Sequence, residues 1–342
     1  MKNKIAVIGA GAIGSLIAAY IAKAGHHVSI IDTWPQHIET IKTQGLTLNA
    51  DNDEFTVPID AFHLGELSNS NPKFDFVFCC VKSQDTVWVI KFIERYMSPA
   101  GVIISAQNGI NDEIIASLVG FSKTIGCVIT LGAMLIEPGI VKRTSAKENP
   151  ALTLGELNGL ISSRLNFLKD ILELVGPIAL TNNLWGQRWA KLAQNCMSNS
   201  LAGVTGLGSR ELRTRDDTLR ILVEIATEVV NVAKVLGISI EAINGVESKL
   251  FSSDSTVNKD IIMKLLKKDA YKLGEGKPSL LQDIEKKRLT EVDFLNGYIV
   301  KKGKEVGVKT PLNERLVELV HEIEKGNKIQ DINYAVELLT KK

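Results

Sequence analysis

The chain has 342 residues, 45% of them hydrophobic, a composition typical of a globular protein. It is long enough for two domains of roughly 100–200 residues each. Lys and Arg number 40 against 39 Asp and Glu, so the formal net charge is +1. This balance excludes the basic excess with which proteins bind nucleic acid or an anionic membrane surface. We therefore expect small molecules or protein as partners, with no nucleic acid and no membrane.

Four cysteines form neither a C-x-x-C pair nor a Cys/His cluster; they are Cys79, Cys80, Cys127 and Cys196. A disulfide framework and a metal site are therefore not expected. Cys79 and Cys80 fall inside an apolar run, so we expect them to be small buried hydrophobic residues in a reducing compartment.

The chain is uncharged from Ile5 to Ala22, and such a run after a basic start is also typical of a secretory signal or a membrane span. Three glycines divide this run into a short β-branched strand and an alanine-rich helix. That division favours a folded α/β segment, and we expect a cytoplasmic protein.

Short apolar runs alternate with helical stretches through the first half, which favours a parallel sheet covered on both faces. Between residues 45 and 59 an alternating pattern around an Asn/Asp turn predicts a hairpin. The predicted strands are Ile5–Ile8, Val28–Ile31, Phe76–Val81, Val102–Ser105 and Ile125–Val128. The predicted helices are Ile13–Ala24, Pro35–Gln44, Asp85–Tyr96 and Asp112–Leu118.

From Asn158 onward the hydrophobic period becomes helical, with one strand-like piece at Ile178–Thr181. The G-P and N-N pairs between Gly176 and Asn183 mark a break. We therefore predict an α/β domain over residues 1–182 and an all-α domain over 183–342. The predicted helices are Leu160–Val175, Trp185–Leu201, Asp216–Leu236, Val257–Lys267, Glu291–Val306, Leu312–Glu324 and Ile329–Leu339.

The segment Gly9-Ala10-Gly11-Ala12-Ile13-Gly14 fits G-x-G-x-x-G directly after a strand and at the start of a helix. The first glycine permits a tight turn, the second lets backbone approach a pyrophosphate, and the third allows close helix packing. The helix N-terminus faces the phosphates. In this context the motif predicts a dinucleotide site.

The next predicted strand is followed by Asp32, close to the roughly 20 residues after the glycines expected for an acid that binds a ribose 2′-hydroxyl. A carboxylate there would repel the extra phosphate of NADP, and no Arg or Lys occurs between Thr33 and Gln36. The pattern favours NAD over NADP. Asp32 is also a candidate N-cap of the Pro35 helix.

Two polar segments follow strands of the predicted sheet, where ligands bind in open α/β folds. Lys82 follows the third strand, and Asn108 follows the fourth with a donor and an acceptor to offer a nicotinamide amide or a ribose. A solvated loop lysine and a simple turn are the alternatives for these two residues.

On the Trp185 helix, Lys191, Asn195 and Asn199 recur every four residues and so share one face. Asparagine lowers helix propensity, which suggests that this face binds something. Near the C-terminus, Glu291 follows Thr290, and Asp293 comes three residues after Thr290. This pattern alone does not separate a capping carboxylate from a catalytic one.

These segments together resemble the ketopantoate reductase (2-dehydropantoate 2-reductase) family. The resemblance spans nearly the whole chain and is carried by G-A-G-A-I-G, V-K-S, Q-N-G-I, E-P-G-I-V at 137–141, W-x-K-x-x-x-N-C at 189–196, and S-L-L-Q-D with T-E-V-D-F-L-N-G at 279–297. It implies a Rossmann-type α/β N-terminal domain and an all-α C-terminal domain like that of 6-phosphogluconate dehydrogenase.

The resemblance implies that Lys191 is the general acid that protonates the carbonyl oxygen as hydride arrives from the nicotinamide. Such an amine, with an ordinary pKa near 10.4, is a better acid when burial lowers that pKa. Glu291 would position the lysine and interact with substrate. The groups expected to hold the keto acid are Asn195, Asn199 and Ser279, and those expected near the cofactor are Lys82 and Asn108.

The chain departs from the family pattern in two ways. Members that reduce ketopantoate usually prefer NADPH and carry a basic or hydroxyl residue where Asp32 stands, whereas NAD-preferring members act on other branched 2-keto acids and give D-2-hydroxy acids. The residues at 241–277 and after Gly326 fall outside the motifs, which leaves the substrate open. A non-catalytic descendant is disfavoured because the implied catalytic and binding residues are all present. The resemblance also implies a homodimer.

Overall fold

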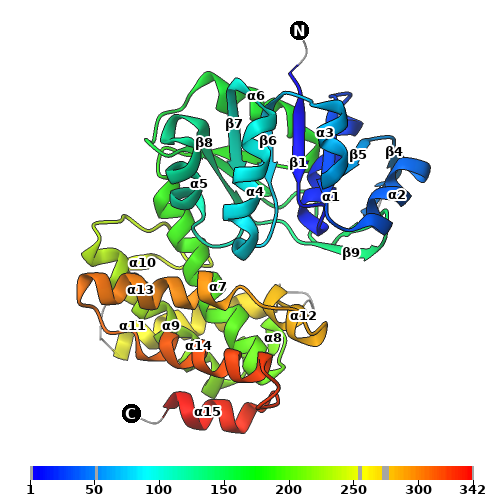
Figure 1. Cartoon of the computed structure of the whole chain (residues 1–342). Coiled ribbons are helices and arrows are strands. Elements are labelled where there is room, and N and C mark those ends of the chain that lie inside the picture. Colours follow the sequence, from blue (N-terminus) through cyan, green and yellow to red (C-terminus); the bar gives the residue numbers. More distant parts are fainter. Residues whose placement is uncertain (1–2, 51–52, 253–255, 272–276, 341–342) are drawn as a thin grey trace. The chain divides into compact units, whose positions relative to one another are not determined.

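The structure is a computed structural model that describes residues 3–50, 53–252, 256–271 and 277–340 (Figure 1). It divides into two compact units, residues 1–184 and 185–342, whereas the sequence placed the boundary after residue 182. The stretch 241–277, which falls outside the sequence motifs, includes residues 253–255 and 272–276, and these lie outside the described residues, as do residues 341–342 of the tail.

The first unit is built on an eight-stranded sheet in the order β12-β11-β8-β7-β6-β1-β2-β5. The neighbours from β5 to β8 are parallel, while β11 runs antiparallel to β8. In the central register Ile5 lies beside both Val28 and Phe76. The strands are β1 (Ile5–Ile8), β2 (Val28–Asp32), β5 (Asp60–His63), β6 (Phe74–Cys79), β7 (Met97–Ser105), β8 (Thr124–Ile129), β11 (Leu152–Glu156) and β12 (Ile178–Leu180).

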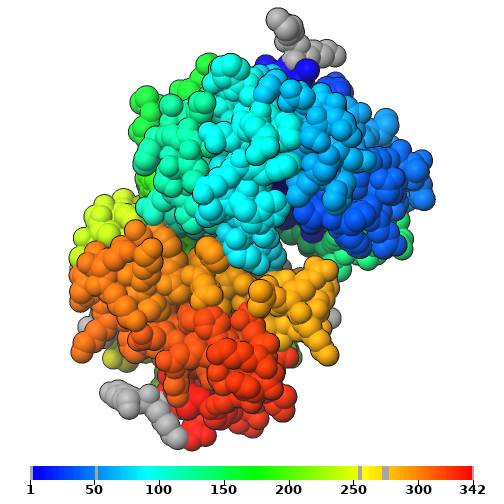
Figure 2. All heavy atoms as spheres, in the orientation of Figure 1, coloured from blue at the N-terminus to red at the C-terminus, as the bar shows by residue number. Residues whose placement is uncertain are grey.

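Strand β1 is buried on both faces, which explains why it is a continuous apolar run. Ile5 and Val7 join the core under α1 and α6, and Ala6 and Ile8 join the core under α4 and α5. In the space-filling view, side chains of α4 and α5 hide the sheet behind them (Figure 2). The main helices of this unit are α1 (Ala12–Lys23), α2 (Pro35–Gln44), α3 (Leu67–Ser70), α4 (Thr86–Ile93), α5 (Asp112–Val119) and α6 (Ser163–Ile171).

A four-stranded sheet in the order β4-β3-β10-β9 packs beside α1. The predicted hairpin is confirmed by the antiparallel pairing of β3 with β4. Strands β9 and β10 were not predicted; β10 pairs with β9 in an antiparallel hairpin and with β3 in parallel. The strands are β3 (Leu46–Ala50), β4 (Asp53–Val57), β9 (Ala133–Glu137) and β10 (Ile140–Arg143).

The second unit is helical, as predicted, with α9 at its centre in contact with α8, α10, α11, α13, α14 and α15 (Figure 1). Among the described residues, none of the helices combines the length and apolarity that a bilayer crossing requires. The helices are α7 (Leu184–Thr205), α8 (Ser209–Thr214), α9 (Asp216–Val235), α10 (Ser248–Phe251), α11 (Thr256–Ala270), α12 (Ser279–Glu285), α13 (Asn296–Val306), α14 (Pro311–Glu324) and α15 (Ile332–Thr340).

Several helix predictions were wrong at their ends, and two of them bear on the site or its surroundings. The helix expected over Leu160–Val175 is the shorter α6, because Ser162 caps it by accepting a hydrogen bond from the backbone N–H of Leu165. The helix expected from Glu291 begins only at Asn296, after a 3₁₀ turn over Val292–Phe294. Helix α12 was not predicted.

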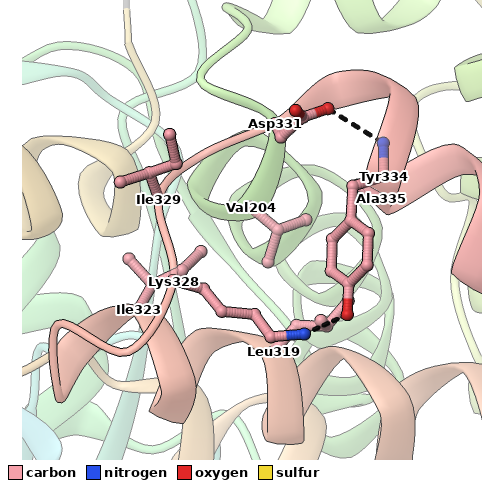
Figure 3. Close-up of a pocket in the computed structure, with 8 residues that line it drawn as sticks. All are labelled: Val204, Leu319, Ile323, Lys328, Ile329, Asp331, Tyr334 and Ala335. Atoms are coloured by element: carbon pink, nitrogen blue, oxygen red, sulfur yellow. Dashed lines mark hydrogen bonds between the residues drawn. The ribbon is translucent and has the colours of Figure 1, made fainter.

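The C-terminal tail is held against the end of α7. Gln330 donates to the carbonyl of Gly203 at 2.7 Å, and the N–H of Asp331 donates to the carbonyl of Val204 at 3.2 Å. These bonds satisfy carbonyls that the end of a helix leaves unpaired. Beside them lies a small pocket across which Lys328 contacts the Tyr334 hydroxyl, lined by Val204, Leu319, Ile323, Lys328, Ile329, Asp331, Tyr334 and Ala335 (Figure 3).

Candidate active site

The carboxyl ends of β2, β1, β6 and β7 lie along one edge of the main sheet, because these neighbouring strands are parallel. The chain continues from β1 to β2 on one side and returns through β6 on the other. Ligands bind at such a switch point in open α/β sheets. Asp32 ends one of these strands, and the glycine turn, Lys82 and Asn108 follow others that end at this edge.

Each glycine of the turn has a different reason to lack a side chain. Gly9 has a φ of +95°, and a Cβ there would lie 2.7 Å from the backbone nitrogen of Val81. A Cβ on Gly14 would overlap the carbonyl oxygen of Gly9. Gly11 has open space around it, since a Cβ there would have no neighbouring atom within 4 Å. The turn therefore packs tightly at its ends and leaves room at Gly11, where backbone N–H groups begin α1.

Asp32 lies at the end of β2 and is bonded to the glycine turn. Its Oδ2 accepts from the N–H of Ala10 at 2.6 Å, and its Oδ1 accepts from the N–H of Trp34 at 2.8 Å. The alternative of Asp32 as the N-cap of α2 is wrong, because Trp34 occupies the cap position. The carboxylate is therefore fixed beside the turn, as a ribose-binding acid requires.

Lys82 and Asn108 sit on two loops that a buried polar network joins. Ser83 donates to the carbonyl oxygen of Asn108 at 3.4 Å, and Asn111 donates to the same carbonyl at 2.8 Å. Gln107 donates to the carbonyl of Val81 at 3.0 Å. The network fixes the loops after β6 and β7 against each other. The roles of Ser83, Gln107 and Asn111 could not be predicted from the sequence, although these residues lie in or next to the motifs V-K-S and Q-N-G-I.

Lys191 lies on α7 in the second unit, and its Nζ donates to Gln194 Oε1 at 3.3 Å. Burial lowers the pKa of Lys191 to about 8. An ammonium with this pKa is mostly protonated at neutral pH yet gives up its proton far more readily than an ordinary lysine. The residue has the acidity that a proton donor to a carbonyl oxygen needs.

The asparagines predicted to share a face with Lys191 are buried, with 5% of Asn195 and 9% of Asn199 exposed. Asn199 Nδ2 donates to Ser279 Oγ at 3.4 Å, so the structure brings together two of the predicted substrate residues. Ser279 is the first residue of α12, a helix that sequence reasoning missed. Amides and a hydroxyl can hold a carboxylate or a hydroxyl group.

Glu291 is 5% exposed and begins the 3₁₀ turn before α13. Thr290 and Asp293 do not cap this turn: the Thr290 hydroxyl accepts from the N–H of Val292 at 3.3 Å, and Asp293 pairs with His321 at 3.1 Å. The N–H of Thr290 donates to Glu324 at 2.8 Å. The positioning of Lys191 by Glu291 stays a prediction.

Two of the sequence motifs meet through Asn296, which sequence reasoning gave no role. Its Nδ2 donates to the carbonyl of Cys196 on α7 at 3.2 Å and to Asn313 Oδ1 at 2.9 Å. Asn313 in turn donates to Glu228 Oε2 at 2.7 Å. This buried chain of hydrogen bonds fixes the segment that carries Glu291 against the helix that carries Lys191.

A glycine turn at the switch point of a parallel sheet, with an acid at the end of the next strand, is the dinucleotide site of nicotinamide-dependent dehydrogenases. The second unit adds a partly buried lysine of lowered pKa and the buried amides of Asn195 and Asn199. The fold and these side chains define a two-domain oxidoreductase.

Comparisons with known proteins identify the family of oxidoreductases to which this protein belongs. The family model described as "Ketopantoate reductase PanE/ApbA" matches residues 5–159, and its C-terminal counterpart matches residues 183–324. The 2-dehydropantoate 2-reductase of Archaeoglobus fulgidus is 30% identical over 95% of this chain and 99% of its own length. This chain belongs to the ketopantoate reductase family, a family of NAD(P)-dependent 2-hydroxy acid oxidoreductases, which confirms the resemblance and the fold class inferred from sequence.

Solved structures agree with this placement. A D-mandelate dehydrogenase, solved with NADH and anilino(oxo)acetate, has a TM-score of 0.81 and 26% identity over 94% of this chain and 98% of its own. A ketopantoate reductase from Staphylococcus aureus, described as dimeric, has a TM-score of 0.71 and 17% identity over 95% of this chain and 100% of its own, which shows the shared fold.

Proposed function

We propose that this protein is a 2-dehydropantoate 2-reductase, which reduces ketopantoate to (R)-pantoate with NAD(P)H in pantothenate and coenzyme A biosynthesis. The observation that carries this proposal is Lys191: burial lowers its pKa to about 8, and it shares α7 with Asn195 and Asn199. Full-length relatives named 2-dehydropantoate 2-reductase, at about 30% identity, support the substrate.

In this proposal Lys191 donates a proton to the carbonyl oxygen, and Glu291 holds the lysine in place. A bound reduced nicotinamide supplies the hydride to the carbonyl carbon. Neutralising the developing alkoxide is the step that a positioned acid accelerates. Lys82 and Asn108 contact the cofactor and the reacting end of the substrate. The keto acid is held by Asn195, Asn199 and Ser279.

The residues of the first unit fit a dinucleotide, because Gly11 leaves open space beside the first N–H groups of α1. Asp32 decides between the two nicotinamide cofactors in this proposal. Its carboxylate accepts hydrogen bonds, which suits a ribose 2′-hydroxyl, and carries the same charge as the 2′-phosphate of NADP. We therefore propose NAD as the preferred cofactor.

A second candidate function is an NAD-dependent D-2-hydroxy acid dehydrogenase that acts on another branched 2-keto acid. The similarity to a D-mandelate dehydrogenase with NADH favours it, together with Asp32. The two candidates share the same proton donor and the same hydride transfer, and they differ in the group that the substrate pocket accepts beside the 2-keto acid.

The deciding experiment compares initial rates with ketopantoate and 2-ketoisovalerate, each with NADH and with NADPH, on the purified full chain. A high rate with ketopantoate supports the biosynthetic reductase. Turnover of 2-ketoisovalerate with NADH, without detectable turnover of ketopantoate, supports the second function. No turnover with any of the four combinations contradicts both.

We also propose that the protein is a cytoplasmic homodimer. The support is the family relationship and the description of one structural relative as dimeric. Light scattering coupled to size-exclusion chromatography tests the assembly: the expected mass is twice 37.4 kDa. A mass of 37.4 kDa at micromolar concentration contradicts it.

A further inference from the structure

His37 lies outside the glycine motif but is bonded to it. The residue sits on α2 with its side chain fully buried, and its ring stacks on Trp34 with centroids 5.5 Å apart. Its Nδ1 accepts from the N–H of Gly139 at 2.9 Å, and its Nε2 lies 3.3 Å from Ser15 Oγ. His37 therefore connects the β9–β10 turn with α1.

The partners of His37 determine which atom donates in each hydrogen bond of the series that joins Gly139, His37, Ser15 and Ala10. A backbone N–H can only donate, so Nδ1 accepts, and the neutral ring carries its proton on Nε2. Nε2 then donates to the Ser15 hydroxyl, and that hydroxyl donates to the carbonyl oxygen of Ala10 at 3.0 Å. This series of hydrogen bonds runs from Gly139 through His37 and Ser15 to the glycine turn.

The neutral state of His37 is consistent with donation from Nε2 to Ser15. Burial lowers the pKa of the imidazole, while the nearby Asp32 carboxylate and the Ala10 carbonyl act in the opposite direction. Burial is the largest of these effects, so the ring is neutral near pH 7. Among the described residues, the Asp32 carboxylate is the charged group that acts on the pKa of the ring.

This series of hydrogen bonds orients the peptide group between Ala10 and Gly11. No cis peptide bond occurs among the described residues, so the Gly11 N–H points away from the Ala10 carbonyl that Ser15 holds. The N–H of Ala10 is held from the other side by Asp32 at 2.6 Å. Fixing the Ala10 carbonyl therefore aims the Gly11 N–H, at the position where the turn is open.

We propose that His37 and Ser15 are positioning residues that aim the Gly11 N–H at the phosphates of the bound dinucleotide. This inference rests on the proposed cofactor site at the glycine turn and adds two residues that the motif does not contain. His37 acts through Ser15, and neither side chain contacts the cofactor.

Two substitutions at position 37 separate this role from simple filling of the core. In His37→Asn the amide oxygen takes the place of Nδ1 and keeps the bond to Gly139, but the side chain does not reach Ser15. In His37→Gln the amide nitrogen reaches the place of Nε2 and keeps the donation to Ser15. Both variants lose the ring that stacks on Trp34.

The readout is the dissociation constant of NADH, measured by titrating cofactor fluorescence on the full chain, with NADPH as the second ligand. We expect Ser15→Ala and His37→Asn to raise it about 5- to 30-fold, and His37→Gln to change it less than about threefold. The double variant Ser15→Ala/His37→Asn should bind NADH no more weakly than the single variant with the higher dissociation constant, because both substitutions break the same series of hydrogen bonds.

Thr43→Ala is the matched control, because it removes an exposed hydroxyl of α2 that donates to the carbonyl of Glu39. It should bind NADH as the wild type does, and thermal unfolding confirms that each variant is folded. Equal losses in His37→Asn and His37→Gln, or unchanged binding by Ser15→Ala, would overturn the inference. A wild-type chain that binds neither NADH nor NADPH would overturn the proposed function itself.

Discussion

Replacing Lys191 removes the proposed proton donor. Burial lowers the pKa of this residue from the ordinary 10.5 to about 8. We expect Lys191→Ala to lower kcat for keto acid reduction by a factor on the order of 10² or more, since general acids contribute about that much. Steady-state rates at saturating NADH measure the effect. Lys304→Ala, at an exposed lysine of α13, is the control and should retain the full rate.

The pH dependence of the wild type follows from the same group. Reduction needs protonated Lys191, so kcat/KM for the keto acid should be flat below about pH 8 and fall tenfold per pH unit well above that value. Oxidation of the hydroxy acid needs the neutral amine, so its rate should rise over the same range. A reduction rate that stays constant up to pH 10 would contradict the assignment of Lys191 as the acid.

Asp32 gives a second prediction for a single residue. Asp32→Asn keeps an oxygen that can accept from the Ala10 N–H and removes the charge that repels a 2′-phosphate. We expect the ratio of kcat/KM for NADPH to that for NADH to rise roughly 10- to 100-fold, or about 1.4–2.8 kcal/mol. Asp60→Asn, at the exposed start of β5, is the control. An unchanged ratio would show that the charge of Asp32 does not select the cofactor.

At the level of elements, substitutions in the glycine turn should affect stability and cofactor binding separately, depending on which glycine is replaced. Gly11 has an ordinary φ of −68° and open space, so Gly11→Ala should change the free energy of unfolding by less than about 1 kcal/mol while weakening NADH binding at least about tenfold. Gly9→Ala combines a φ of +95° with contact against the backbone of Val81. It should cost at least about 2 kcal/mol of stability.

Urea unfolding and NADH titration measure these two effects side by side. The prediction fails if Gly11→Ala destabilises the chain as much as Gly9→Ala does, or if Gly11→Ala binds NADH with unchanged affinity. In either case the open space at Gly11 would not be cofactor space.

The elements that could be predicted from the sequence are those whose pattern is local. Strand β1, helix α1 and the hairpin of β3 and β4 follow from short-range periodicity and turn residues. The start of α13 could not be predicted, because the backbone just before the 3₁₀ turn is held by a long-range bond, from the N–H of Thr290 to Glu324. The same limit applies to the pairing of β10 with β3, which comes from a distant part of the chain.

The residues of the candidate site also divide into those that a local sequence pattern predicts and those that only long-range contacts define. The glycines, Asp32 and the α7 face are visible because their spacing along the chain has a physical meaning. His37, Gln107 and Asn296 have no such spacing, since their partners come from other elements. His37 meets Gly139 across about a hundred residues, and Asn296 meets Cys196 across the same separation. Only the folded chain brings these polar side chains together.

At the scale of the whole molecule, the proposal divides the chemistry between two compact units. The first unit carries the glycine turn and Asp32, and the second carries Lys191, Asn199 and Ser279. Each unit should therefore respond to a different ligand. Hydrogen exchange detected by mass spectrometry resolves this, because binding lowers the exchange of backbone amides that it orders or covers.

We expect NADH alone to slow exchange in peptides that cover residues 9–16 and 28–34. Adding ketopantoate to the complex with oxidised NAD, which has no hydride to give, should slow exchange in peptides that cover residues 190–200 and 279–285. Helix α15 is the internal control, because it lies outside both sets of residues and should exchange at the same rate in every state. Slowing confined to the first unit on addition of the keto acid would contradict the placement of the substrate residues on α7 and α12. Slowing in the second unit without any change around the glycine turn would contradict the placement of the cofactor.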